Sequence, residues 1–158
     1  MTRYAANTEV SADRSRSEIE RILQRYGADQ FMYGWEQAHA VVQFRAHGRH
    51  IRFLLDMPDP KDREFTHTPN RGNARTPQQA FAAWEQATRQ RWRALKLVIQ
   101  AKLEAVEAGI TEFEAEFLAH IVLPDGTTVG QWALPQVATA YELGTMPKML
   151  PAVSEVAS

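Results

Sequence analysis

Cysteine is absent from this chain of 158 residues. Its absence excludes a disulfide framework, zinc sites built from thiolates and a cysteine nucleophile, and it is compatible with a reducing compartment. The chain also lacks any run of about 18 consecutive apolar residues, the length that a membrane helix needs. Its opening residues, MTRYAANTEVSADRSR, contain no apolar signal-peptide core. We therefore expect a cytoplasmic protein that has no membrane partner.

Motifs of the common enzyme classes are missing as well. The chain has no Gly-x-Ser-x-Gly elbow, no glycine-rich phosphate loop and no His-Glu-x-x-His pair. Asp62, Glu64 and His67 offer oxygen and imidazole groups, but their spacing matches no known set of metal ligands, so we expect turn and capping roles for them. We predict a protein with no metal site and no cofactor that is not an enzyme, although the sequence does not exclude catalysis.

Charge is present but unevenly distributed along the chain. Residues 43–102 hold twelve Lys or Arg against five Asp or Glu, whereas residues 103–158 hold one Lys against eight Asp or Glu. The formal net charge of −1 thus conceals a basic middle and an acidic C-terminal third. A basic segment attracts polyanions and acidic protein surfaces, so nucleic acid or an acidic host protein is the expected partner. The acidic third could also meet the basic middle of a second copy, giving a homo-oligomer, or could simply keep the surface solvated.

Hydrophobic periodicity predicts one α+β domain over residues 1–144, with a long loop at 57–76 and a loose tail at 145–158. The expected elements are a short helix at about 16–26, strands at 31–35, 39–46 and 51–55, a helix from Pro77 to just before Gly109, a short helix after Thr111, a hairpin of 120–123 with 127–132, and a helix from Pro135 to Gly144. This order predicts a three-stranded antiparallel meander packed on one long helix, followed by a small helix–β-hairpin–helix appendage.

A tight turn at Gly48 and Arg49 would set the register of the hairpin formed by the second and third strands. In that register Phe44 lies opposite Phe53 on an apolar face, and Arg45 lies opposite Arg52 on the other face. Two arginines in direct opposition repel each other unless a carboxylate, solvent or a bound anion compensates. The pairing is therefore an argument for an anion-binding face.

The basic residues of this hairpin and of the long helix are the predicted phosphate ligands of a nucleic-acid site. They are Arg45, Arg49, Arg52, Arg89, Arg93 and Lys96. Tyr33 and Trp35 are predicted to stack on unpaired bases beside them. The alternative is that these cations are ordinary solvated surface charges. Within the long loop, Lys61, Arg63, Arg71 and Arg75 are further candidates for phosphate contact.

Four stretches carry a resemblance to known proteins: residues 4–15 (YAANTEVSADRS), 30–35 (QFMYGW), 91–109 (RWRALKLVIQAKLEAVEAG) and 122–132 (VLPDGTTVGQW). Together they resemble a family of small uncharacterised proteins encoded by bacteriophages and prophages, over most of the chain. The resemblance implies a bacterial host cell and phage biology, without an activity. The order of three strands and a long helix is also similar to the core of phage single-strand annealing proteins, a likeness of fold order alone.

Two functions follow from these observations as expectations. The first is a non-enzymatic nucleic-acid-binding protein that prefers single strands and is accessory to phage replication or recombination. The alternative is a phage protein-binding module that inhibits a host enzyme or defence complex through one of its charged poles.

Overall fold

The computed structural model of the protein describes residues 3–36 and 38–146. Its elements are α1 (Arg3–Arg25), β1 (Gln30–Glu36), β2 (His39–Ala46), β3 (Arg49–Asp56), α2 (Arg63–Thr66), α3 (Pro77–Glu107), α4 (Phe113–Glu116), the 3-10 helix η1 (Leu118–His120) and α5 (Val129–Leu143). The strands form one antiparallel sheet in the order β1-β2-β3. The predicted α+β fold, with a meander packed on a long helix, is confirmed. Most of the predicted tail lies outside the described residues.

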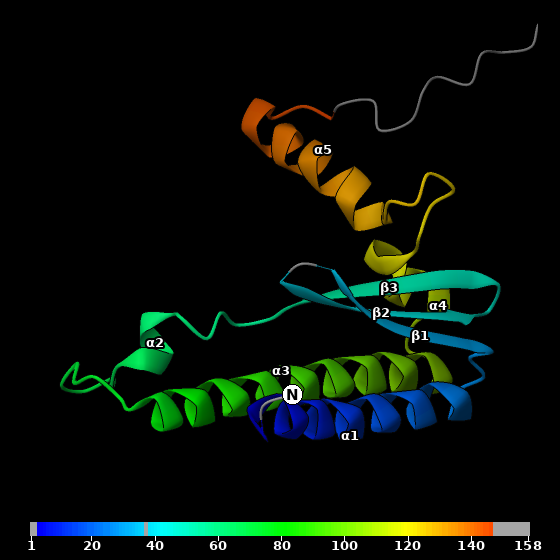
Figure 1. The fold of residues 1–158 in the computed structure, drawn as a ribbon. Helices are drawn as coiled ribbons and strands as arrows, with labels where there is room; N and C mark the ends of the chain where they lie inside the picture. The colour runs from blue at the N-terminus through cyan, green and yellow to red at the C-terminus, as the bar shows by residue number, and fades with distance from the viewer. Residues whose placement is uncertain (1–2, 37, 147–158) are drawn as a thin grey trace, which may run out of the picture.

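The sheet has a helical layer on one face only. Figure 1 shows α1 and α3 side by side beneath the sheet, and α5 on the opposite side, pointing away from both layers. We call the face toward α1 and α3 the core face and the other the outer face. Because successive residues of a strand point to opposite faces, the strands place apolar side chains on the core face in alternation. Ala40, Val42, Phe44 and Ala46 of β2 are accordingly buried, and the residues between them are not.

The long helix α3 forms as its sequence predicts. The side-chain oxygen of Thr76 accepts a hydrogen bond from the backbone amide of Gln79, and the side-chain oxygen of Gln79 accepts one from the backbone amide of Thr76. Pro77 occupies the first turn. One face of the helix is buried against the sheet and α1: Thr88, Trp92, Leu95, Ile99 and Leu103. Over 31 residues this helix extends about 46 Å.

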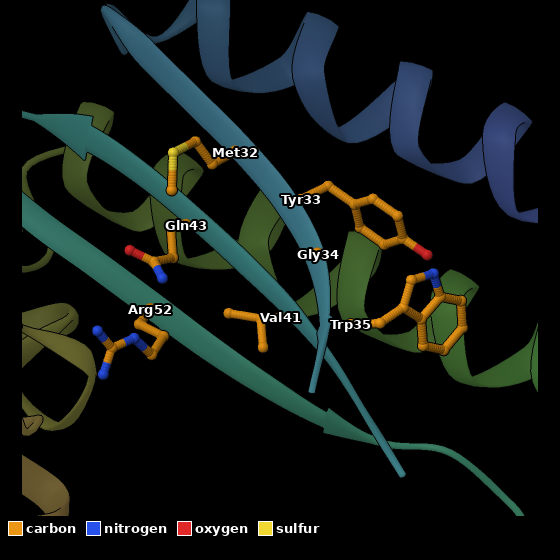
Figure 2. A pocket seen from close by; sticks show the side chains of 7 residues that line it. All are labelled: Met32, Tyr33, Gly34, Trp35, Val41, Gln43 and Arg52. Atoms are coloured by element: carbon orange, nitrogen blue, oxygen red, sulfur yellow. The ribbon is translucent and has the colours of Figure 1, made fainter. Parts of the chain in front are cut away.

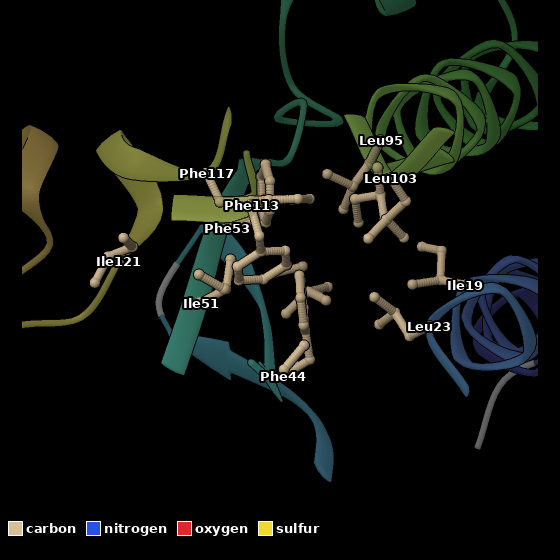
Figure 3. Close-up of a cluster of buried hydrophobic side chains, with 14 of the residues drawn as sticks. Ile19, Leu23, Phe44, Ile51, Phe53, Leu95, Leu103, Phe113, Phe117 and Ile121 are labelled. Atoms are coloured by element: carbon tan, nitrogen blue, oxygen red, sulfur yellow. The ribbon is translucent and has the colours of Figure 1, made fainter. Parts of the chain in front are cut away.

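The hydrophobic core continues past α3 into α4. Phe113 of α4 and Phe117, which directly follows that helix, join the cluster formed by the strands, α1 and α3, as Figure 3 shows. The ring of Phe117 is fully buried, with its centroid 5.8 Å from that of Phe44 and 6.4 Å from that of Phe53. Residues 113–117 therefore belong to the main body, and the predicted appendage is wrong for this segment.

The predicted register of the β2–β3 hairpin is wrong by two residues. The turn consists of His47 and Gly48, both with positive φ angles of 52° and 73°, and it pairs Phe44 with Ile51 and Arg45 with His50. A two-residue hairpin turn of this kind needs left-handed backbone at both positions, and glycine takes the second one without strain. A shift of two residues keeps every side chain on its predicted face. It removes the opposition of Arg45 and Arg52.

The helix boundaries and the last hairpin also differ from the prediction. The first helix begins at Arg3 rather than near residue 16, since no glycine or proline interrupts residues 3–25. The expected strand at 127–132 instead begins α5, because Thr128 and Gln131 form a second capping box, and Pro135 lies inside this helix. The hairpin is reduced to a single bridge between Val122 and Thr128. The helix nonetheless ends, as predicted, at a left-handed Gly144.

The region 57–76, predicted as a long loop, contains local structure. It holds α2 and a bridge between His67 and Ala74, and Phe65 of α2 is buried. The indole nitrogen of Trp84 on α3 donates a 2.7 Å hydrogen bond to the carbonyl of Pro58. This bond attaches the start of the region to α3.

Candidate interaction surfaces

The hairpin arginines predicted to bind phosphate are engaged within the chain. Arg45 forms a bidentate ion pair with the carboxylate of Asp29, with Nη2–Oδ2 and Nε–Oδ1 distances of 2.6 and 2.9 Å. The two residues meet because β1 begins directly after Asp29, opposite Arg45. The guanidinium holds the pKa of Asp29 below its usual value, and the carboxylate raises the pKa of Arg45. Arg49 pairs with Glu114 at 2.7 Å, and Arg52 donates to the carbonyl of Gly126 at 2.7 Å.

Two of the three cations predicted on α3 are likewise paired. Arg89 contacts Glu85 one turn earlier, and Lys96 contacts Glu18 of α1, each at 3.1 Å. The hydrogen bond from Lys96 is the main cause that lowers the pKa of Glu18. Arg93 is exposed and has no carboxylate partner among the residues that the structure describes.

The six predicted phosphate ligands therefore do not form one free basic groove. Carboxylates of the same chain neutralise Arg45, Arg49, Arg89 and Lys96. The two acids paired with the hairpin belong to a loop before β1 and to α4, so only the tertiary fold brings them there. Exposed ion pairs of this kind add little stability, but each one removes a charge that a polyanion would need.

The two aromatic residues predicted to stack on bases differ in their exposure. The ring of Tyr33 packs on buried Trp92 at a centroid distance of 5.4 Å, and the guanidinium of Arg16 lies 4.0 Å from its centroid on a face of the ring. Burial raises the pKa of Tyr33. Trp35, by contrast, is 60% exposed at the end of β1. Only Trp35 presents an open aromatic surface to a ligand.

A shallow groove lies on the outer face of the sheet, with a volume of about 480 Å³. Met32, Gly34, Val41, Gln43 and Arg52 line it on the outer face, and Tyr33 and Trp35 border it at the edge strand β1, with side chains that point to the core-face side in Figure 2. The strand register aligns Met32, Gln43 and Arg52 in one row across the sheet, and Gly34 with Val41 and Leu54 in the next. Gly34 has no side chain, so the floor of the groove is low at its centre. The groove is thus apolar along β1 and cationic on β3.

The helix α5 has the most exposed apolar surface of any described element. Leu134, Val137 and Tyr141 follow at helical spacing and form one stripe, in which Tyr141 is 87% exposed. Glu142 is the only charged residue in the helix. Among the described residues, α5 packs mainly against η1 (Figure 1). Its apolar stripe therefore has no partner there.

The first turn of α5 is fixed to the body of the protein. The backbone amide of Val129 donates to the carbonyl of Ile121 at 2.9 Å, and Gly130 is buried against η1. A Cβ at Gly130 would lie 2.9 Å from the carbonyl oxygen of Ala119, so only glycine allows this approach. The direction in which α5 projects is consequently set by packing at its N-terminal end.

The loop at 57–76 contains the four further cations that the sequence suggests for phosphate contact. In the described part of the chain, Lys61, Arg63 and Arg71 have no carboxylate partner, whereas Arg75 donates to the carbonyls of Glu64 and Phe65.

Across residues 3–36 and 38–146, no three His, Asp or Glu side chains gather into a group that could hold a metal ion. Nor does any helix in those ranges have the length and apolar character to cross a membrane.

Comparison with known proteins places the chain in no group. No family model, no curated protein and no solved structure matches it. The resemblance to phage-encoded proteins therefore stays a prediction, and function has to be inferred from the surfaces described above.

Sequence reasoning missed both α5 and the groove as binding surfaces. The signal for α5 was present: Leu134, Val137 and Tyr141 at i, i+3 and i+7 in a helix with one charge. The prediction began this helix at Pro135, which left Leu134 outside the helix and so divided the stripe. The groove could not be seen from sequence, since it depends on which face of the sheet the helices leave uncovered.

Proposed function

We propose that this protein is a protein-binding module and that α5 is its docking helix. The observation that carries the proposal is the stripe of Leu134, Val137 and Tyr141, which is exposed on a helix that projects from the body of the protein. Contiguous exposed apolar surface is costly in water and marks interaction sites. An amphipathic or apolar helix that offers side chains at i, i+3 and i+7 fits the recognition mode in which a helix lies in an apolar groove.

The chemistry of α5 defines its partner. A helix with Glu142 as its only charge needs a partner whose groove is apolar along most of its length. The negative end of the helix dipole and Glu142 lie together near the C-terminus of α5, so a cationic rim on the partner is favourable there. Nucleic acid has no such apolar groove. The internal ion pairs of Arg45, Arg49, Arg89 and Lys96 point the same way, since they lower the charge available to a polyanion.

A photocrosslinking amino acid at position 141 tests this proposal in cells that produce the protein. We expect ultraviolet light to attach a protein chain to the variant at 141, and we expect the adduct to survive nuclease treatment. The matched control carries the same amino acid at Ile110, an apolar residue that is 80% exposed outside α5. Equal adducts from both positions, or an adduct from 141 that nuclease removes, would contradict the proposal.

Binding of single-stranded nucleic acid is the second candidate. One observation favours it: Arg52 and Gln43 lie in a row on the outer face, and exposed Trp35 borders the same groove from the end of β1, with its ring on the core-face side of that strand. Charge, amide and aromatic ring together suit a stacked, unpaired strand. On this alternative, the affinity for a dT oligonucleotide falls linearly with salt on logarithmic axes, and Trp35→Ala weakens it. No measurable binding at about 50 mM salt would exclude it.

A further inference from the structure

Two surfaces of the same chain lack partners and have matching chemistry. One is the apolar stripe of α5, and the other is the outer-face groove. We infer that the partner of α5 is a second copy of this chain, whose groove receives the stripe, and that the two copies exchange their α5 helices reciprocally. The inference rests on the proposed function and names the partner of the same helix.

The dimensions of the two surfaces match. The 15 residues of α5 span about 22 Å, and the eight residues of β2 and of β3 span about 26 Å. A helix laid along the strands therefore covers the groove from end to end. It also covers the apolar residues that the outer face exposes among its polar ones, Met32 and Leu54.

Charge fixes the direction of the docked helix. The outer face carries one cation that no described carboxylate neutralises, Arg52, toward the His47–Gly48 turn, since Arg45 is paired with Asp29 and Asp56 contacts His39. The C-terminal end of α5 carries Glu142 and the negative end of the helix dipole. Glu142 of one copy consequently lies near Arg52 of the other.

Reciprocal exchange follows from how α5 is held. Because Gly130 and Val129 fix its first turn to η1, α5 points away from its own sheet (Figure 1). Each copy thus presents one helix and one empty groove. In a dimer with a two-fold axis, the helix of each copy occupies the groove of the other, and the assembly is closed. A stable protein interface buries on the order of 1,600 Å² in total, so each of the two contacts has to supply about 800 Å².

Two substitutions, one on each surface, test the exchange. Val137→Glu places a charge on the stripe of α5. Gly34→Glu fills the groove, and it leaves the core intact because a Cβ at Gly34 meets no atom within 4 Å. Light scattering coupled to size exclusion should give the wild type twice the 17.9 kDa of one chain and each variant a single chain. An equimolar mixture of the two variants should form a heterodimer, since the α5 of the Gly34 variant finds an intact groove on the Val137 variant.

Leu97→Glu is the matched control, since it adds the same charge at another exposed apolar residue, on α3, and should leave the dimer intact. Circular dichroism verifies that each variant is folded. Tyr141→Glu on the stripe and Leu54→Glu on the outer face are a second pair of single substitutions that repeat the test. A dimeric Gly34→Glu variant would overturn the inference in favour of contact between two α5 helices. A monomeric wild type would overturn it too, while a crosslink from position 141 to a different protein would leave the proposed function standing.

Discussion

Phe117→Ala is the substitution that tests most directly whether the segment after α3 shares the core of the sheet. The ring is fully buried and lies 4.7 Å from that of Phe113, in addition to its contacts with Phe44 and Phe53. Removing a buried phenylalanine ring costs about 3–5 kcal/mol, through lost burial and the cavity left behind. The three edge or tilted ring contacts favour the upper half of that range, since each aromatic pair contributes about 0.5–1.5 kcal/mol beyond its area.

Equilibrium unfolding in urea measures this cost. With a denaturant dependence of about 2 kcal/mol per molar urea, a loss of about 4 kcal/mol moves the midpoint down by about 2 M. The measurement is made at one protein concentration, because the proposed dimer would add concentration-dependent stability. Ile110→Ala is the control, since this side chain is largely exposed. If the two variants have the same midpoint, α4 does not pack into the core, and the reasoning on the C-terminal segment fails.

Three further predictions concern packing, pH and charge. Gly130→Ala should destabilise the protein by about 1–3 kcal/mol in urea unfolding, because its Cβ meets the carbonyl of Ala119, whereas Gly34→Ala, where there is open space, should not. Burial, aided by the charge of Lys102, lowers the pKa of His120, so the unfolded chain takes up a proton before the folded chain does as pH falls below about 6.5. The free energy of unfolding should therefore drop there in the wild type and in the control His50→Gln, and less in His120→Gln. On the second candidate function, Asp29→Asn combined with Glu114→Gln releases two guanidinium groups, and the salt dependence of dT oligonucleotide binding should steepen by up to about 1.4 on logarithmic axes. An unchanged slope in filter binding would contradict phosphate contact by Arg45 and Arg49.

Sequence predicts this fold well where the determining interactions are local. The boundaries of α3 depend on Thr76, Pro77 and Gln79 at one end and on a glycine at the other, all close in sequence to the helix that they bound. The alternation in β2 predicts its buried face for the same reason. The turn at His47 and Gly48 shows the limit: histidine adopts a left-handed conformation there only because the two strands are held in register by the rest of the sheet.

The ion pairs of the predicted phosphate ligands could not be read from the sequence, because the contacts that form them join residues that are distant along the chain. Arg45 and Asp29 are 16 residues apart, Lys96 and Glu18 are 78 apart, and Arg52 and Gly126 are 74 apart. A count of charges along the chain sees a basic middle and an acidic end, but it does not see which of them meet. The acidic C-terminal third does supply a partner for the basic hairpin, within the same molecule, through Glu114 and Arg49.

The internal pairing of charges changes what the remaining surface can recognise. With most of the predicted phosphate ligands paired inside the chain, the exposed apolar surface becomes the stronger feature: it lies on the stripe of α5 and on the β1 side of the outer-face groove. Both are positioned by rigid elements, one by the Gly130 contact with η1 and the other by the strand register. Surfaces that are apolar, exposed and rigid lose little entropy on binding, which favours a protein partner over a flexible polyanion. Because one chain carries both halves of such a contact, a second copy is the simplest partner that satisfies them together.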